Sequence, residues 1–188
     1  MQKPSLRFAG TLILLVCSAC AKPKIDLGQI TRPERSGELD AYQVFVGEWK
    51  WEAEMLNAEG ADRKWNGTAE WHWGLDRRYL MGSMKSKSER AQFESSGVWS
   101  WHPTRKEYRW WMFNDWGYPQ EGKAKYDERN RSWQMPYISC GLDGTTSHGE
   151  YCVTVVDNNT LQWTAVEWAD ALHMVKKMEM RGTYKRAR

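Results

Sequence analysis

The stretch GVWSWHPTRKEYRWWMFNDWG, residues 97–117, contains five tryptophans in 21 residues, and the spacing of these residues decides the fold. Trp99 and Trp101 are separated by one residue, so in an extended strand both side chains lie on the same face. The same spacing recurs in EWKWE and EWHW, which contain the pairs Trp49/Trp51 and Trp71/Trp73. The period is two and not 3.6, which indicates half-buried β-strands.

Turn signals separate these strands from residue 45 onward. They are short clusters of Gly, Pro, Asn, Asp and other polar residues at 57–62, 74–78, 86–90, 102–107, 115–119, 127–131, 140–149, 157–159 and 169–171. This spacing predicts about ten strands and no long helix. Because open sheet edges promote aggregation, a meander of this size is expected to close. The sequence therefore predicts an all-β fold, a single antiparallel up-and-down β-barrel.

Three local features refine this prediction. Residues 39–46 are expected to form a short helix or turn that leads into the barrel. Asn158 and Asn159 suit a two-residue hairpin turn with positive φ. Pro136 cannot donate a backbone hydrogen bond, so its strand is expected to be an edge strand or to carry a bulge there.

The N-terminus has the layout of an export signal. Lys3 and Arg7 precede an apolar run at 8–17 that is too short to span a membrane. Ser18-Ala19-Cys20 resembles the end of a bacterial lipoprotein signal peptide, in which the cysteine is lipidated and becomes the new N-terminus. Ordinary secretion with cleavage nearby and an uncleaved anchor are the alternatives.

The predicted organisation has three parts: a signal peptide at 1–19, a lipidated N-terminus with a flexible tether at 20–40, and a barrel domain at 41–188. Ala21 stands where an inner-membrane lipoprotein typically has Asp, so the resemblance favours a cell-envelope protein anchored in the outer membrane and facing the periplasm. Several acyl chains would anchor it stably, because each buried methylene contributes about 0.8 kcal/mol.

The charge balance excludes a nucleic-acid-binding surface. Cleavage would remove Lys3 and Arg7 and lower the formal net charge from +3 to +1, whereas binding along a nucleic-acid backbone needs a clustered basic excess.

Two cysteines remain besides Cys20. In an oxidising compartment Cys140 and Cys152 are expected to form one disulfide, with two reduced buried thiols as the alternative. His148 lies between them, but the spacing supplies no clear fourth ligand, so no metal site is predicted.

Three stretches resemble the uncharacterised DUF1579 proteins, which are similar to calycin and lipocalin-like barrels: FVGEWKWEAEM (45–55), GVWSWHPTRKEYRWWMFND (97–115) and VKKMEMRGTYKR (175–186). The resemblance implies that Gly47 and Trp49 of the first strand and Tyr184 and Arg186 of the last close the barrel. A cation–π contact between Arg186 and Trp49 would join the two strands.

Haem-binding relatives of these barrels repeat Gly after the first-strand Trp and use a His near the C-terminus. This chain has Trp51 and Ala53 at the glycine positions, and His173 falls beside a predicted turn. A haem cofactor is therefore not expected.

The inward-facing side chains are the candidate ligand-binding residues. A ten-stranded barrel is generally too wide for its own side chains to fill, so we expect a cavity for a small apolar or aromatic ligand. Plain core packing is the alternative for each tryptophan. The candidates are Trp51, Trp71, Trp73, Trp99, Trp101, Trp110, Met178 and Met180.

Adjacent Trp110 and Trp111 must face opposite sides of their strand. Trp111, with Trp116 and Tyr118 in the following turn, is a candidate aromatic surface for an envelope protein or glycan partner. The alternative is a loop folded back over the rim of the barrel.

The sequence thus favours a membrane-anchored lipoprotein that binds a small apolar or aromatic molecule without catalysis. An interaction or structural protein with a filled barrel is the alternative. A hydrolase or isomerase that uses His72 or His102 is the third hypothesis; no catalytic motif supports it.

Overall fold

The computed structural model describes residue 28 and residues 31–187. The chain divides into two units, 1–33 and 34–188, and all strands of the described part belong to the second. The predicted signal peptide, Cys20 and residues 20–27 and 29–30 of the predicted tether lie outside the described residues. In the part of the chain that is described, no helix has the length and apolarity needed to cross a membrane.

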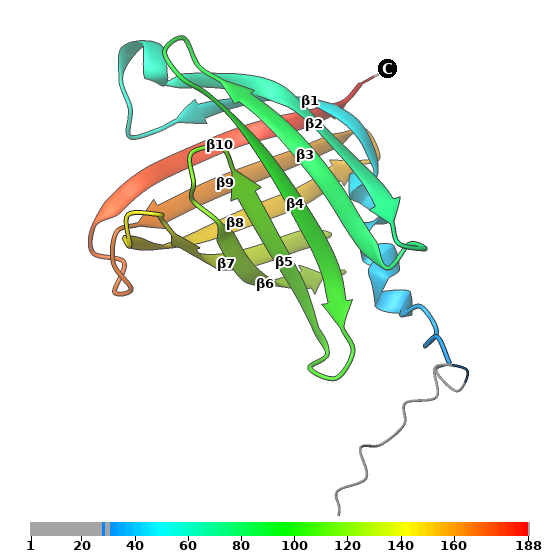
Figure 1. Ribbon diagram of the computed structural model, residues 1–188. Helices are drawn as coiled ribbons and strands as arrows, with labels where there is room; N and C mark the ends of the chain where they lie inside the picture. Colours follow the sequence, from blue (N-terminus) through cyan, green and yellow to red (C-terminus); the bar gives the residue numbers. More distant parts are fainter. Residues whose placement is uncertain (1–27, 29–30, 188) are drawn as a thin grey trace, which may run out of the picture. The chain divides into compact units, whose positions relative to one another are not determined.

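The second unit is a closed antiparallel barrel in which each strand pairs with its neighbours in sequence and β10 pairs with β1 (Figure 1). The predicted fold class is therefore confirmed. Its ten strands are β1 (Gly47–Met55), β2 (Lys64–Gly74), β3 (Tyr79–Lys87), β4 (Gln92–His102), β5 (Glu107–Asn114), β6 (Gln120–Asp127), β7 (Ser132–Cys140), β8 (Thr146–Asp157), β9 (Thr160–Trp168) and β10 (Lys176–Arg186).

Two short 3-10 helices accompany the strands. η2 (Gly37–Phe45) precedes β1, and η3 (Gly60–Asp62) lies in the β1–β2 loop. η2 is the short helix expected near residues 39–46. Its Leu39 is buried, and the compact unit begins at Glu34, so the barrel unit starts before the predicted boundary at residue 41.

Helix η2 fills one end of the barrel, which we call the plugged end. The ring of Tyr42 stacks on that of Trp133, with centroids 4.7 Å apart, and meets Tyr108 edge-on at 5.2 Å. Phe45 packs against Trp133 at 5.8 Å. Tyr42 and Trp133 are almost completely buried. Aromatic packing therefore accounts for this half of the interior, as the core-packing interpretation of the tryptophans expected.

The seam between β1 and β10 contains the predicted closure pair. Trp49 stands directly opposite Arg186, whose guanidinium lies 4.3 Å from the indole centroid. Arg186 also donates to the carbonyl of Val46 at 2.6 Å and to that of Val44 at 3.2 Å. Gly47 has φ +126°, and a Cβ there would collide with the Arg186 guanidinium. Arg186 thus links the last strand to the chain that enters the first.

Two local predictions were partly wrong. Asn158 and Asn159 form the β8–β9 turn, but neither has positive φ; the Asp157 carboxylate accepts a hydrogen bond from the Asn159 N–H at 2.7 Å, which holds the turn. Pro136 lies in neither an edge strand nor a bulge. It pairs with Glu150 on β8. On the β6 side it has no paired residue, but the register of the β6–β7 pairs is the same before and after it.

The predicted disulfide is wrong, because Cys140 and Cys152 are both free. On the β7–β8 ladder Cys140 stands opposite Thr146, whereas Cys152 stands opposite Gln134, six residues away along β7. At about 3.3 Å per residue this is roughly 20 Å, far beyond the Cα separation that a disulfide permits.

We expect both thiols to react with a maleimide in the absence of reductant. Cys140 is exposed and should react first, whereas burial raises the pKa of the Cys152 thiol and slows its reaction. Peptide mass spectrometry at successive times gives the order of labelling. A peptide pair cross-linked through Cys140 and Cys152 would contradict the register.

Candidate functional site

A cavity of about 380 Å³ occupies the interior beyond the plugged end. Its walls are mainly indole, phenol and thioether groups that face inward from the strands. Six of the eight predicted ligand-binding residues line it: Trp51, Trp71, Trp99, Trp110, Met178 and Met180. Sequence reasoning missed other lining residues, among them Trp65, Trp163, Tyr137, Tyr151 and Met84.

The other two predicted residues, Trp73 and Trp101, do not line the cavity. Trp73 donates from Nε1 to the side chain of Gln43 in η2 at 2.9 Å, and the guanidinium of Arg77 lies 5.6 Å from its ring centroid. Trp101 meets Tyr108 edge-on at 4.8 Å. Both contacts belong to the plugged end. The period of two identified the correct face of each strand but not the depth along the barrel axis.

Inward-facing glycines stand directly opposite five of the lining rings. A Cβ on any of them would collide with the ring; for example, it would lie 2.8 Å from Trp51 at Gly67 and 2.6 Å from Trp163 at Gly182. Each ring therefore lies flat along the wall, over the neighbouring strand. This arrangement leaves space in the lumen. The five pairs are Trp51/Gly67, Trp71/Gly82, Trp110/Gly122, Tyr137/Gly149 and Trp163/Gly182.

A carboxylate network lies where the cavity opens, at the end of the barrel opposite η2. Glu167 accepts hydrogen bonds from the hydroxyls of Tyr137 at 3.0 Å and Ser147 at 2.8 Å, and the ammonium of Lys177 lies 3.5 Å away. Burial, with the nearby Glu167 charge, raises the pKa of Tyr137. Among the described residues that line the cavity, Glu167 and Lys177 are the only charged ones, and they face each other at its mouth.

Tyr184 was predicted only as a closure residue, but it also lines the cavity. Its hydroxyl lies 3.3 Å from that of Tyr151 and 3.4 Å from the sulfur of Met84. Because β10 and β3 are separated by two strands, the contact with Met84 reaches across the interior. Tyr184 therefore limits the shape of the cavity.

The residues predicted as an aromatic partner surface do not form one platform. Trp116 and Tyr118 line the cavity at its rim, where Trp116 is 52% exposed and packs against Phe93 at 5.2 Å. Trp111 lies on the outer face of β5, with the guanidinium of Arg109 5.7 Å from its ring centroid. As predicted, Trp110 and Trp111 face opposite sides of the strand.

None of the described residues that line the cavity is a histidine. His72 and His102 are exposed, and the His102 Nδ1 accepts a hydrogen bond from the Arg105 backbone. His173 in the β9–β10 loop stacks on Trp168 with ring centroids 4.0 Å apart, away from the cavity lining. Within residues 31–187 and Gly28, no three His, Cys, Asp or Glu side chains gather to hold a metal ion.

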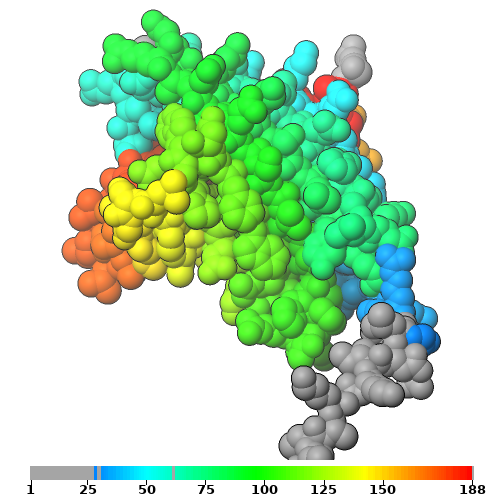
Figure 2. All heavy atoms as spheres, in the orientation of Figure 1, coloured from blue at the N-terminus to red at the C-terminus, as the bar shows by residue number. Residues whose placement is uncertain are grey.

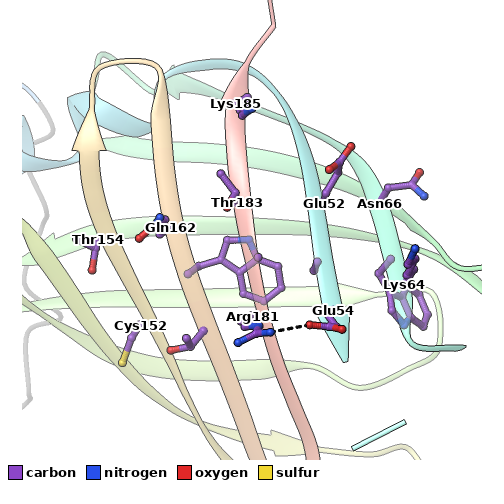
Figure 3. A pocket seen from close by; sticks show the side chains of 15 residues that line it. Glu52, Glu54, Lys64, Asn66, Cys152, Thr154, Gln162, Arg181, Thr183 and Lys185 are labelled. Carbon is purple, nitrogen blue, oxygen red and sulfur yellow. Dashed lines mark hydrogen bonds and ion pairs between the residues drawn. The ribbon is translucent and has the colours of Figure 1, made fainter. Parts of the chain in front are cut away.

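A second hollow, of about 1000 Å³, is an open groove on the outer face of β8, β9, β10, β1 and β2 (Figure 3). Most of its polar side chains are exposed. Glu54 pairs with Arg181 across the groove at 2.9 Å and with Arg63 beside it at 2.6 Å, and these hydrogen bonds lower the pKa of Glu54. Exposed ion pairs of this kind are typical of a solvated surface. The internal cavity is therefore the candidate functional site.

Alkaline pH is expected to destabilise the barrel between about pH 10 and 12. Burial raises the pKa of five of the eight tyrosines. For two of them, Tyr108 and Tyr184, the pKa rises to about 12. Because the unfolded value is about 10, their contribution is complete below pH 10 and is lost as the pH rises through 12. Absorbance at 295 nm should show delayed ionisation in the folded protein and ionisation near pH 10 in denaturant. Eight tyrosines that titrate near pH 10 without denaturant would contradict the burial.

No family model and no curated protein matches this chain. Solved structures share its fold. Rv2717c from M. tuberculosis has a TM-score of 0.60 at 9% sequence identity, over 82% of this chain and 100% of that one. The S-type phycobiliprotein lyase CPES from Guillardia theta has a TM-score of 0.52 at 9% identity, over 82% of this chain and 94% of the lyase. These similarities support the lipocalin-like barrel, while membership of the DUF1579 family stays a prediction.

Proposed function

We propose that the protein binds a small, flat, apolar or aromatic molecule in the barrel cavity and does not transform it. The observation that carries this proposal is the cavity itself, whose wall is built from indole, phenol and thioether groups. Such side chains bury apolar ligands and stack on rings, and Met adapts to irregular shapes. The glycines opposite the rings support a binding role, because the absence of a side chain there lets each ring lie against the wall and leaves the lumen free for a ligand.

We further propose that this binding occurs in the cell envelope, with the protein attached through a lipidated Cys20. The support comes from the N-terminal sequence: two basic residues, a short apolar run, and small residues before Cys20. Mass spectrometry of the N-terminal peptide from cells tests this proposal. An unmodified Cys20, or an N-terminus elsewhere, would contradict it.

Intrinsic fluorescence tests ligand binding directly, because several of the cavity-lining residues are tryptophans. A form lacking residues 1–20 is titrated with 9-fluorenone and with fluorene, which share a flat tricyclic frame. We expect saturable quenching by at least one of them. N-acetyltryptophanamide at equal absorbance controls for inner-filter effects. Quenching that matches this control for both compounds would contradict the proposal.

A second candidate function, contact with an envelope protein or glycan, is favoured by exposed apolar side chains around the mouth. Leu142 in the β7–β8 loop is 87% exposed, and Leu172 and Met174 in the β9–β10 loop are 82% and 79% exposed. The two loops lie side by side at one end of the barrel (Figures 1 and 2). A photo-crosslinking residue at position 142 should capture a defined partner in cells, whereas the same residue at position 75, in the β2–β3 turn, should not.

A further inference from the structure

One side of the cavity wall contains buried polar atoms that have no hydrogen-bond partner. Ser86 on β3 and Ser95 on β4 are only 4% and 5% exposed, and neither hydroxyl has a partner within the described part of the chain. The Nε1 of Trp51 is also buried and unpartnered. All three residues line the cavity.

The strand register gathers these atoms in one region. Trp51 stands opposite Gly67 on β2, and Gly67 stands opposite Ser86. The Trp51 Nε1 lies 2.8 Å from the place a Cβ on Gly67 would take, so it lies over β2, one strand from Ser86. Adjacent strands are about 4.8 Å apart. Ser95 stands opposite Met84, two residues from Ser86 on the same face.

The chemistry of this region favours a neutral acceptor on the ligand. An indole N–H can only donate, and serine hydroxyls can donate. The Nε1 of Trp163, whose ring centroid is 6.0 Å from that of Trp51, is a further buried donor without a partner. The only charged lining residues, Glu167 and Lys177, face each other at the mouth, so a buried ligand charge would lack a counter-charge beside the serines.

Resting on the proposed function, we infer that Ser86, Ser95 and the Trp51 indole form a hydrogen-bonding subsite for a carbonyl-type oxygen. The ligand class is then a flat aromatic or conjugated molecule whose rings contact the apolar wall and whose neutral oxygen faces β1–β4. Native proteins leave few buried polar groups unpaired, and such a ligand would pair these.

The test compares 9-fluorenone with fluorene, which lacks the carbonyl oxygen, on the full chain and its variants. The Ser86→Ala/Ser95→Ala double variant is the probe, and Ser96→Ala is the matched control, because Ser96 is the next residue on β4 and faces outward. All titrations use one detergent concentration, so partitioning of each compound into detergent cancels between proteins. Tryptophan quenching reports the dissociation constants.

We expect Ser96→Ala to match the parent chain within twofold for both compounds. The double variant should lose about tenfold in fluorenone affinity and keep its fluorene affinity within twofold. A fluorenone affinity that the double variant leaves unchanged would overturn the subsite and leave the proposed function standing. Failure of both compounds to bind the parent chain would overturn the proposed function and the subsite together. The double variant should unfold at no lower temperature than the parent, because the serine hydroxyls make no hydrogen bond that it removes.

Discussion

Replacing Gly82 by alanine should lower the affinity for a bound aromatic probe at least tenfold. Gly82 stands opposite Trp71, and the three atoms nearest to a Cβ there all belong to the indole. The Trp71 ring is enclosed by Tyr184 at 5.5 Å and by Trp49 and Trp99 at 6.4 Å each. It can therefore yield only toward the lumen, where it would take the ligand's place.

Gly37→Ala is the matched control for Gly82→Ala. Gly37 begins η2, and a Cβ there meets nothing within 4 Å. Fluorescence titration with 9-fluorenone gives the affinities, and thermal unfolding gives the stabilities. We expect the overpacked Gly82→Ala variant to lose about 1–3 kcal/mol of stability while remaining folded. A folded Gly82→Ala protein with parental affinity would show that the rings do not bound the ligand site.

The second large effect is on stability. Trp49→Ala should lower the free energy of unfolding by roughly 3–5 kcal/mol, as removal of large buried aromatic side chains does. Trp49 is 1% exposed and donates from Nε1 to the Phe45 carbonyl at 2.8 Å. Its ring makes a cation–π contact with the Arg186 guanidinium. Its loss would remove contacts with η2 and with β10 at once. Denaturant unfolding followed by circular dichroism measures the change.

Trp111→Ala is the control for the loss of an indole, because Trp111 lies on the outer face of β5, with the Arg109 guanidinium 5.7 Å from its ring centroid. It should cost about 1 kcal/mol or less. Equal stability of the two variants would show that the β1–β10 seam does not depend on Trp49.

The sequence predicted the barrel because its main determinants are local. Alternation of Trp with polar residues marks the inward face of each strand, and clusters of turn residues mark the hairpins. Trp49 and Trp51 show this well, since both are nearly fully buried while Glu48, Lys50 and Glu52 are exposed. Resemblance at the two ends of the domain also placed Trp49 beside Arg186.

Depth along the barrel axis could not be predicted from alternation. Trp71 and Trp73 share a face, yet Trp71 lines the cavity and Trp73 contacts Gln43 of η2. The difference arises from η2, which fills the plugged end, and the short segment GELDAYQVF before β1 does not by itself show that it enters the barrel. The disulfide prediction failed for a related reason. An oxidising compartment would allow a bond, but the distance between Cys140 and Cys152 becomes known only from the β7–β8 register.

The sequence also contains a signal for the cavity. Inward-facing glycines occur within strands, at Gly67, Gly82, Gly122, Gly149 and Gly182, where glycine normally weakens a sheet. Each stands opposite a ring only once the register is known. The pairing of glycine with an aromatic ring therefore needed the folded structure to become visible.

The central claim is that this barrel holds a small molecule, and native mass spectrometry tests it most directly. The parent chain and Gly82→Ala are purified from cells in mild detergent, and the mass of each covalent chain is subtracted. We predict a reproducible extra mass on the parent chain that is lost on denaturation and reduced on Gly82→Ala. Bare chains in both samples, with no saturable quenching by either probe, would contradict the claim.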